Sequence, residues 1–416
     1  MMGGLEMNIL VQKFGGTSVE SHQKMIEVSN IIKDTKEKGY DVVVVVSAMG
    51  RSGSPYATDT LIELCKQANE VVSDRELDLI MSCGEIISGS ILVHTLKRGG
   101  LDSILLTGGQ AGIVTDEKYG DASVIQIDPI NVIENLKEGK VVVVTGFQGI
   151  TRSGEVTTLG RGGSDTSAVI LGAGLNVKVV EIYTDVDGIM TADPRIEDSA
   201  QVITNINYDE VFQMADKGAK VIHPRAVEIA KNNNIIVKIK NTFNPSEGTS
   251  IGGCITHNID TYKSSKDGKL ITAVAHKNRL TQILIENCQE ELFTDILTDI
   301  EKNNISMDMI NFFIKEKIFT IDSDKTNILK QILDSYKVEY KIVKDCSKVT
   351  LIGSKITGIP GVMAQIVKTL TKENIKILQT SDSHMTISIL VEENNIKKAV
   401  NALHREFRLS EIKAIY

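Results

Sequence analysis

Runs of consecutive Val, Ile and Leu recur along the first part of the chain, and they limit the possible folds more than any other feature. A run such as Val42–Val46 has no polar face, so a strand made from it must be covered on both sides. Stretches with helical spacing separate these runs, and this alternation predicts a mainly parallel α/β sheet between two layers of helices. The predicted strands are Ile9–Gln12, Val42–Val46, Ile104–Leu106, Val141–Val144, Val179–Ile182 and Ile235–Ile239, and the clearest helices are Met25–Lys36, Leu77–Lys97 and Asp165–Leu175.

A stretch rich in Gly, Asn and Ser, Asn241–Lys269, interrupts this alternation and predicts a domain boundary. The length of 416 residues suits two or three domains. We expect an α/β domain at 7–245, a linker at 246–268, and two smaller modules at 269–345 and 346–416. The strand near 270–276 is a candidate member of the second module's sheet.

The two small modules are copies of each other. Their apolar positions recur with an offset of 70 residues, and in each copy a strand leads through a loop into an amphipathic helix and another strand. This pattern predicts two βαβ units, used either as a duplicated dimerisation element or as a pair of small-molecule sensors. The matching residues are Leu292, Phe293, Ile296, Leu297, Ile300, Asn304 and Ile305 with Val362, Met363, Ile366, Val367, Leu370, Asn374 and Ile375.

Charge and cysteine content exclude several classes of protein. Lys and Arg number 46 against 54 Asp and Glu, and a formal net charge of −8 is a poor match for nucleic acid. Five cysteines without close pairing argue against disulfides and a zinc cluster and predict reduced, buried thiols. The sequence shows no signal peptide and no apolar run of the ~20 residues that a membrane span needs. We therefore expect a cytoplasmic protein that binds neither nucleic acid nor membrane.

A lysine and a glycine turn, Lys13-Phe14-Gly15-Gly16-Thr17-Ser18, directly follow the first predicted strand. Ligands bind at the carboxyl ends of strands in such sheets. Paired glycines let backbone N–H groups approach a phosphate, and a lysine brings a mobile positive charge to it. The spacing differs from that of a P-loop. The alternative is a tight turn with a solvated lysine, and Ser47 ends the second strand in a similar way.

The segment Gly160–Ser167 combines three glycines with Arg161, Ser164 and Asp165 just before a predicted helix. An arginine can hold a carboxylate through paired hydrogen bonds, and an aspartate can hold an ammonium group. Both groups on one anion-binding loop indicate a zwitterionic substrate, an amino acid. The alternative is that Ser164 and Asp165 only cap the helix.

Acidic residues follow the predicted strand Val179–Ile182. Asp185 and Asp187, with Arg195 downstream, could hold the ribose and phosphates of a nucleotide, or could form a surface turn with a weak salt bridge. Lys220 is a further lysine at a turn. No Ser/His/Asp order and no cluster of the seven histidines indicates a hydrolase or a metalloenzyme.

These motifs together resemble the aspartokinase family in order and spacing, over essentially the whole chain. They are Lys13–Ser18, Ser82-Cys83-Gly84-Glu85, Gly160–Ser167, Thr184–Gly188, Asp193-Pro194-Arg195 and Gly218–Pro224. The likeness is greatest to the monofunctional, diaminopimelate- or lysine-sensitive bacterial type. It implies an amino acid kinase fold followed by two α+β ACT modules, and transfer of the ATP γ-phosphoryl group to the β-carboxylate of L-aspartate. A different amino acid kinase, for glutamate or N-acetylglutamate, and a catalytically idle amino acid sensor stay as alternatives.

The resemblance also implies roles for individual residues. Lys13 and Asp165 would be catalytic, and no strong base is needed because a carboxylate is already nucleophilic. Magnesium would be held mainly by the nucleotide phosphates and water, so no metal-ligating side chain is predicted. ATP would be bound by Lys13, Gly15, Gly16, Ser47, Thr184, Asp185, Asp187, Arg195 and Lys220, and aspartate by Thr17, Ser47, Glu85, Arg161, Ser164 and Asp165.

Regulation and assembly follow from the same resemblance. The effector would be an end product of aspartate metabolism bound near Gln289, Met307 and Asp308, with lysine first, diaminopimelate second and threonine third. Acids in that region favour a ligand with a second ammonium group, although they could also be merely solvated. Modules of this size usually pair, which predicts a homodimer or homotetramer. The chain ends at Tyr416 without a fused homoserine dehydrogenase segment, so we expect a monofunctional enzyme.

Overall fold

The computed structural model describes residues 7–69, 71–218, 221–252, 271–354, 356 and 359–411. They form two compact units. The first contains Met1–Ile189, Val202–Phe212 and Lys220–His257, and the second contains Met190–Gln201, Gln213–Ala219 and Asn258–Tyr416. Two short segments from within the predicted catalytic domain therefore pack with the second unit. Most of the predicted linker lies outside the described residues, but its part Thr249–Gly252 is a strand, β12.

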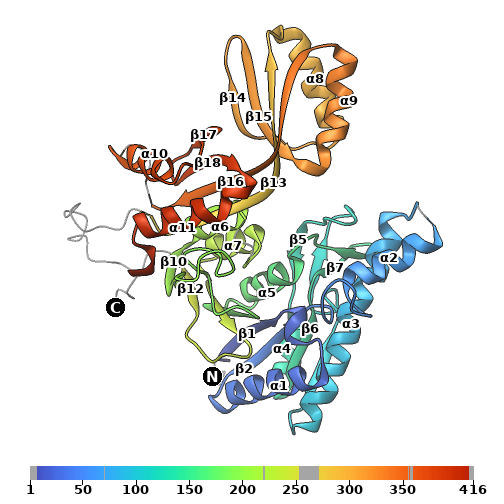
Figure 1. Cartoon of the computed structure of the whole chain (residues 1–416). Helices are drawn as coiled ribbons and strands as arrows, with labels where there is room; N and C mark the ends of the chain where they lie inside the picture. The colour runs from blue at the N-terminus through green and yellow to red at the C-terminus, as the bar shows by residue number, and fades with distance from the viewer. Residues whose placement is uncertain are drawn as a thin grey trace. The chain divides into compact units, whose positions relative to one another are not determined.

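An eight-stranded sheet forms the core of the first unit (Figure 1). Its order is β10-β12-β11-β9-β1-β2-β6-β3, and all neighbours are parallel except β11 and β12. All six strands predicted from the apolar runs are present. The strands are β1 (Ile9–Phe14), β2 (Asp41–Val46), β3 (Ser103–Leu106), β6 (Val141–Thr145), β9 (Val179–Thr184), β10 (Asn205–Asn207), β11 (Ile236–Asn241) and β12 (Thr249–Gly252).

Helices cover both faces of this sheet, as predicted. Gln12 of β1 hydrogen-bonds to Thr35 of α1, while Lys13 contacts Asp165 of α5. Successive residues of a strand point to opposite faces, so α1 and α5 lie on opposite sides. The helices are α1 (His22–Glu37), α2 (Thr58–Ala68), α3 (Asp74–Arg98), α4 (Ile130–Lys137), α5 (Gly163–Gly174), α6 (Tyr208–Asp216) and α7 (Pro224–Asn232).

Helix α3 is long and apolar enough to cross a membrane by length and composition alone. More than half of its most apolar window is buried, however, and its residues Leu92, Val93 and Leu96 pack in the core beside β2 and β6. It is a core helix of the first unit. Its one cysteine, Cys83, is exposed, so the expectation that all thiols are buried is wrong there.

A second, four-stranded sheet of the first unit was not predicted. Its order is β5-β4-β7-β8, and its strands are only three or four residues long. Such short strands carry too little periodicity to recognise in the sequence. The strands are β4 (Ile113–Thr115), β5 (Val124–Ile127), β7 (Gln148–Thr151) and β8 (Val156–Thr158). Strand β8 leads directly into the glycine loop that contains Arg161.

One six-stranded antiparallel sheet, of order β14-β15-β13-β16-β18-β17, forms the frame of the second unit. Each repeat has a further strand and a second helix beyond the βαβ unit that the sequence predicted. The elements are β13 (Ala273–Glu286), α8 (Glu290–Lys302), β14 (Asp308–Phe312), β15 (Glu316–Asp322), α9 (Thr326–Tyr336), β16 (Glu339–Ile352), α10 (Val362–Lys372), β17 (Gln379–Asp382), β18 (Thr386–Glu392) and α11 (Ile396–Glu406).

The two repeats share their longest strands. Ala273–Lys277 of β13 pairs with Lys348–Ile352 of β16, in the second repeat, whereas Gln282–Glu286 pairs with Glu339–Val343, in the first. Register shifts between Lys277 and Gln282 separate the two halves. The module boundary predicted at 345/346 therefore falls inside a single strand, β16.

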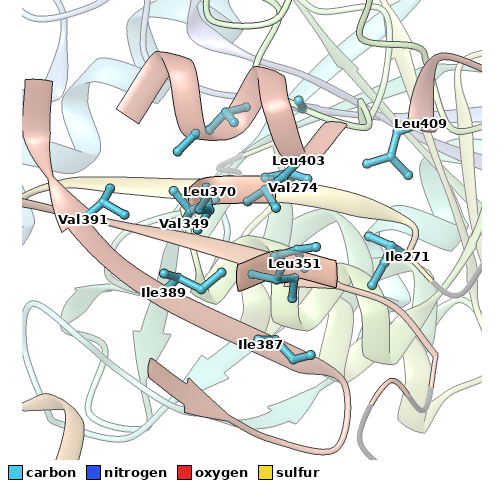
Figure 2. Packing of buried hydrophobic residues seen from close by; sticks show 14 of the residues in the cluster. Ile271, Val274, Val349, Leu351, Leu370, Ile387, Ile389, Val391, Leu403 and Leu409 are labelled. Atoms are coloured by element: carbon cyan, nitrogen blue, oxygen red, sulfur yellow. The ribbon is translucent and has the colours of Figure 1, made fainter. Parts of the chain in front are cut away.

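Apolar side chains from β13, β16, β18, α10 and α11 form the core of the second repeat (Figure 2). Ala192 and Ala200, from the segment Met190–Gln201, belong to the same core. The Val274 N–H donates to the carbonyl oxygen of Thr191 at 2.8 Å, and the Thr191 hydroxyl lies 2.9 Å from His404 Nε2. These buried contacts hold a segment of the kinase-like sequence inside the second unit.

Candidate active site

A cleft of about 460 Å³ opens in the first unit at the carboxyl ends of β1 and β2 and the amino end of α5. This is the edge at which parallel sheets bind their ligands. Of the predicted site residues, seven line the cleft: Lys13, Gly16, Ser47, Glu85, Arg161, Ser164 and Asp165. They come from four separate motifs of the sequence, so the fold brings together half of the residues that the resemblance assigned to ATP and aspartate.

The loops after β1 and β2 approach each other closely at Gly16. A Cβ atom there would lie 2.6 Å from the carbonyl oxygens of both Ala48 and Gly50, closer than real Cβ contacts allow. The Gly50 N–H donates to the Gly16 carbonyl at 3.0 Å, and the Ser47 N–H donates to the Phe14 carbonyl at 3.2 Å. A glycine is required at this position because two backbones meet there.

Lys13 and Asp165 form an ion pair in the wall of the cleft. Their Nζ and Oδ1 atoms are 2.7 Å apart, and both side chains are about nine-tenths buried. The sequence motif predicted that Asp165 binds the ammonium group of a substrate, but in this structure its carboxylate is paired with Lys13. The pair fixes the direction of the Lys13 ammonium group at the end of β1.

Glu85 of α3 is almost fully buried and has only one hydrogen bond at its carboxyl group. Its Oε1 accepts the Ala48 N–H at 2.9 Å, and its Oε2 has no partner among the described residues. Burial raises the pKa of Glu85 to about 8, because removal from water disfavours the charged form. The unused oxygen is an acceptor for a group that enters the cleft.

Helix α5 begins at Gly163, and the preceding residue, Gly162, has a left-handed backbone with φ of 69°. No side chain caps this helix, so the capping role considered for Ser164 and Asp165 is absent. The free N–H groups of the first turn lie at the cleft, where they favour an anion. Arg161 is exposed two residues before the helix, and no hydrogen bond or ion pair occupies its guanidinium among the described residues.

The acidic residues after β9 are held by protein donors. Asp185 Oδ2 forms an ion pair with Arg51 Nη2 at 2.5 Å, and Asp187 Oδ1 accepts from the side chains of Asn241 and Asn244 at 2.7 and 3.0 Å. Thr184 donates its hydroxyl hydrogen to Asp185 Oδ1 at 3.3 Å. These residues do not line the cleft, but Arg51 does.

The other predicted residues lie outside the cleft lining. Gly15 donates its N–H to the Tyr183 carbonyl at 3.1 Å, and the carbonyl of Thr17 accepts from Lys24 Nζ at 3.2 Å. Arg195 belongs to the second unit, where it makes hydrogen bonds of 2.7 to 3.2 Å to the Asp193 side chain. Lys220 lies outside the described residues.

Arg51 and Phe147 are two of the cleft-lining residues that were not among the predicted site residues. Phe147 has a left-handed backbone with φ of 70°, and its N–H donates to Ser167 Oγ at 3.0 Å. Its position directly after Thr145-Gly146, at the end of a buried strand, was the available signal. The exposed charge of Arg51 gave no signal, since its partner Asp185 is distant in the sequence.

The three predicted effector residues lie in the first repeat of the second unit. Gln289 precedes α8, Met307 packs against the core of that repeat, and Asp308 begins β14. Asp308 forms an ion pair with Lys348 of β16, whose side chain is only 2% exposed. Although burial works in the other direction, the hydrogen bond and charge of Lys348 hold the pKa of Asp308 below its usual value. No hydrogen bond joins Gln289 to Asp308 among the described residues.

The described residues offer no group of three or more His, Cys, Asp or Glu side chains that could hold a metal ion. The carboxylates nearest in sequence to the predicted nucleotide segment, Asp185 and Asp187, are already occupied by Arg51 and two asparagines. This donor set suits a magnesium ion that arrives on a nucleotide and keeps phosphate and water ligands.

Comparisons with known proteins show which proteins this chain resembles. The model of the amino acid kinase family matches residues 8–241, and that of the ACT domain matches 341–405. Aspartokinase 1 of Bacillus subtilis is 40% identical over 407 residues, covering 97% of this chain and 100% of the relative. Escherichia coli aspartokinase III in complex with aspartate and ADP has a TM-score of 0.76 at 23% identity, over 96% of this chain and 99% of the other. The same protein in complex with lysine and aspartate gives 0.74 at 24%, over 96% and 99%.

Proposed function

The chain belongs to the aspartokinase family and is an ATP-dependent aspartate kinase, and we propose that the cleft around Lys13 is where the reaction takes place. In this reaction the γ-phosphoryl group of ATP passes to the β-carboxylate of L-aspartate and gives 4-phospho-L-aspartate. The observation that carries the assignment is the buried Lys13–Asp165 pair beside free helix N–H groups and an unpaired arginine. The full-length similarity to aspartokinases sets aside the glutamate and N-acetylglutamate kinases and the idle sensor.

Lys13 would stabilise the phosphoryl group during transfer. Its ammonium group is most valuable when negative charge is spread over the moving oxygens, and a prearranged charge in a partly buried site is worth more than one in water. Asp165 would hold Lys13 in place, since their atoms are 2.7 Å apart. The β-carboxylate of aspartate attacks without losing a proton, so positioning and charge neutralisation are sufficient.

Aspartate would be held by its two α-substituents. Arg161 is exposed at the cleft and has the planar donor fork that suits a carboxylate. Glu85 offers the free oxygen Oε2 to the α-ammonium group, and Ser47 and Ser164 add hydroxyls to the same lining. Since Asp165 faces Lys13, Glu85 is the better candidate for the ammonium group. Thr17, which is outside the lining, would act only after a local rearrangement.

ATP would approach over the glycine loops, with Gly15, Gly16 and the first turn of α5 facing its phosphates. Thr184, Asp185 and Asp187 would contact the ribose of ATP. Arg195 and Lys220 would also contact ATP, and this role rests on the family resemblance alone. Mg²⁺ would be bound mainly by the phosphates, and it would supply further charge neutralisation there.

The assignment is tested by measuring ADP release with aspartate, glutamate and N-acetylglutamate as acceptors. We expect turnover with aspartate only. Lys13→Ala should lower kcat by about 10²-fold or more while changing the KM for ATP little, because its charge acts in the transition state. Lys240→Ala is the matched control, since it breaks a comparable lysine–carboxylate pair with Glu181 outside the cleft. An unchanged kcat in Lys13→Ala would refute the role of Lys13.

We also propose that lysine is the feedback effector, ahead of diaminopimelate and threonine. The bacterial aspartokinase III named above was crystallised with lysine. In this chain Glu290 and Glu291 lie in the first turn of α8, and Asp308 begins β14, all in the first repeat. An effector must bind the inactive state more tightly than the active one, so lysine should raise the apparent KM for a substrate.

Self-association through the ACT repeats, as a homodimer or homotetramer in the cytoplasm, completes the proposal. The hairpin between β14 and β15 exposes Phe312, Phe313 and Ile314, and Ile314 is 96% exposed. Contiguous exposed apolar side chains of this kind mark interaction surfaces.

A further inference from the structure

Two backbone segments form the side of the cleft that carries Arg161. One is Gly120–Ala122, and the other is Thr158–Gly160 at the end of β8. The Ala122 N–H donates to the Thr158 carbonyl at 2.9 Å, which joins the segments, and both Gly120 and Gly160 line the cleft. Any displacement of this pair of segments moves Arg161, which follows Gly160 directly.

The residues of the loop around Arg161 do little by themselves to restrict its backbone conformation. Gly160 and Gly162, on either side of the arginine, have left-handed backbones with φ of 73° and 69°. Glycine allows these conformations but also leaves many others open, so a loop of this composition loses much entropy when it is ordered. Contacts from outside the loop must therefore fix its position.

Asp78 of α3 fixes the segments through their N–H groups. It is completely buried, and both of its oxygens accept the Gly120 N–H at 3.0 Å. Its Oδ2 also accepts the Thr158 N–H at 2.8 Å, and its Oδ1 accepts the Thr158 hydroxyl at 2.6 Å. No cation pairs with Asp78 among the described residues, so these donors alone stabilise its charge. Asp78 precedes Glu85 by two helical turns on the same face of α3.

Arg225 of α7 holds the same two segments through their carbonyl groups. Its Nη1 donates to the Leu159 carbonyl at 3.2 Å, and its Nη2 donates to the Ala122 carbonyl at 3.0 Å. The Asp78 carboxylate thus accepts hydrogen bonds from backbone N–H groups of the two segments, and the Arg225 guanidinium donates hydrogen bonds to their carbonyl groups. The two side chains come from different helices, and neither lines the cleft.

We propose that Asp78 and Arg225 are positioning residues for the amino acid substrate. They hold the glycine loop so that the Arg161 guanidinium stays at the cleft that Glu85 also lines, where the two groups would bind the α-carboxylate and α-ammonium groups of one amino acid. We call the hydrogen bonds of Asp78 and Arg225 to these segments the clamp. Because Asp78 and Glu85 both belong to α3, the clamp fixes the position of Arg161 relative to the helix that carries Glu85. The proposal rests on the proposed roles of Arg161 and Glu85.

The test compares Asp78→Ala, Asp78→Asn and Arg225→Met in the full-length enzyme. Loss of the clamp in Asp78→Ala or Arg225→Met should raise the KM for aspartate by about tenfold, and leave the KM for ATP within about twofold, since a misplaced Arg161 affects only one substrate. Asn can still accept the two N–H groups through its oxygen and donate to the Thr158 hydroxyl, so Asp78→Asn should keep the wild-type KM. Glu181→Gln is the control, because that buried carboxyl has a similar set of donors away from the cleft.

A double variant shows whether Asp78 acts through Arg161. Arg161→Ala should raise the KM for aspartate by itself, and adding Asp78→Ala should then change this KM by less than about twofold. Full additivity, or an equal rise of both KM values in the single variants, would overturn the clamp. If Arg161→Ala leaves the KM for aspartate unchanged, the proposed role of Arg161 fails, while the single variants still decide on Asp78 and Arg225. If Asp78→Ala does not fold, Arg225→Met carries the same comparison.

Discussion

At the scale of single residues, burial of the Glu85 carboxyl group lowers the stability of the fold near neutral pH, and we expect this group to serve substrate binding instead. Burial raises its pKa to about 8, whereas the same carboxyl group in an unfolded chain has its ordinary pKa of 4.5. The folded protein therefore holds a proton there that the unfolded chain releases between these two values. The contribution of Glu85 to stability is fully present below pH 4.5 and is lost as the pH rises to about 8. A residue that served only the fold would not carry this cost near neutral pH.

Glu85→Gln is expected to be more stable than the wild type near pH 8 but to bind aspartate more weakly. In the wild type, the ammonium group of aspartate requires the ionised carboxylate, so binding releases a proton below pH 8. The KM for aspartate should then fall by up to about tenfold per pH unit between pH 6.5 and 8. Thermal melts and KM values over this range measure both effects. The same pH slope in Glu85→Gln would show that another group is responsible.

At the scale of elements, the sheet of the ACT repeats places a lysine where an effector is expected. Lys348 lies in the shared strand β16 and pairs with Asp308 of β14, and burial lowers the pKa of Lys348 despite that partner. Asp308 therefore does not present an unpaired carboxylate in this structure. A dibasic effector would have to displace the Lys348 ammonium group from Asp308 or use Glu290 and Glu291 instead.

Opposite shifts in lysine sensitivity are expected for the two partners. Lys348→Met should lower the concentration of lysine for half inhibition by about tenfold, because it removes a competing ammonium group from Asp308. Asp308→Ala should raise that concentration by a similar factor. Lys317→Met is the control, since Lys317 is also buried in this sheet but donates to the Phe313 carbonyl. Titrations with lysine, diaminopimelate and threonine measure these shifts. Inhibition by threonine alone would contradict the proposed effector.

At the scale of the whole molecule, the two units are not successive pieces of the chain. Ala192 and Ala200 pack in the core of the second unit although they lie within the kinase part of the sequence. Deleting residues 269–416 would remove the core against which these side chains pack, so it would disturb the fold as well as the oligomeric state. The oligomeric state is better tested by substitutions on the surface.

Ile314→Glu together with Phe312→Ser should lower the molar mass measured by light scattering, because a charge and a hydroxyl replace exposed apolar side chains at the proposed interface. Leu64→Glu changes an exposed apolar residue of the kinase unit, 59% exposed, and should leave the mass unaltered. An unchanged mass in the double variant would place the interface elsewhere. Lysine inhibition measured on the same samples shows whether assembly and regulation are linked.

Local pattern alone predicted the central sheet and the edge of the sheet at which the candidate cleft opens. The runs Val42–Val46 and Val141–Val144 can be stable only when buried on both faces, so they predicted parallel strands with helices on each side. The glycine motifs after β1 and before α5 predicted a ligand site at the carboxyl ends of these strands. Such inferences succeed because they depend on neighbours within a few residues.

Contacts between distant residues were decided only by the tertiary structure. Nothing in the sequence shows that Asp165 faces Lys13, that Asp78 holds Thr158, or that Thr191 contacts His404, because each pair depends on how separate elements pack. The pairing of β13 with β16 across both repeats likewise arises from strand register, which requires partners far along the chain. Residue types and their spacing therefore predicted residues that the fold brings together in the cleft, while packing decided which of them are already paired with other protein groups.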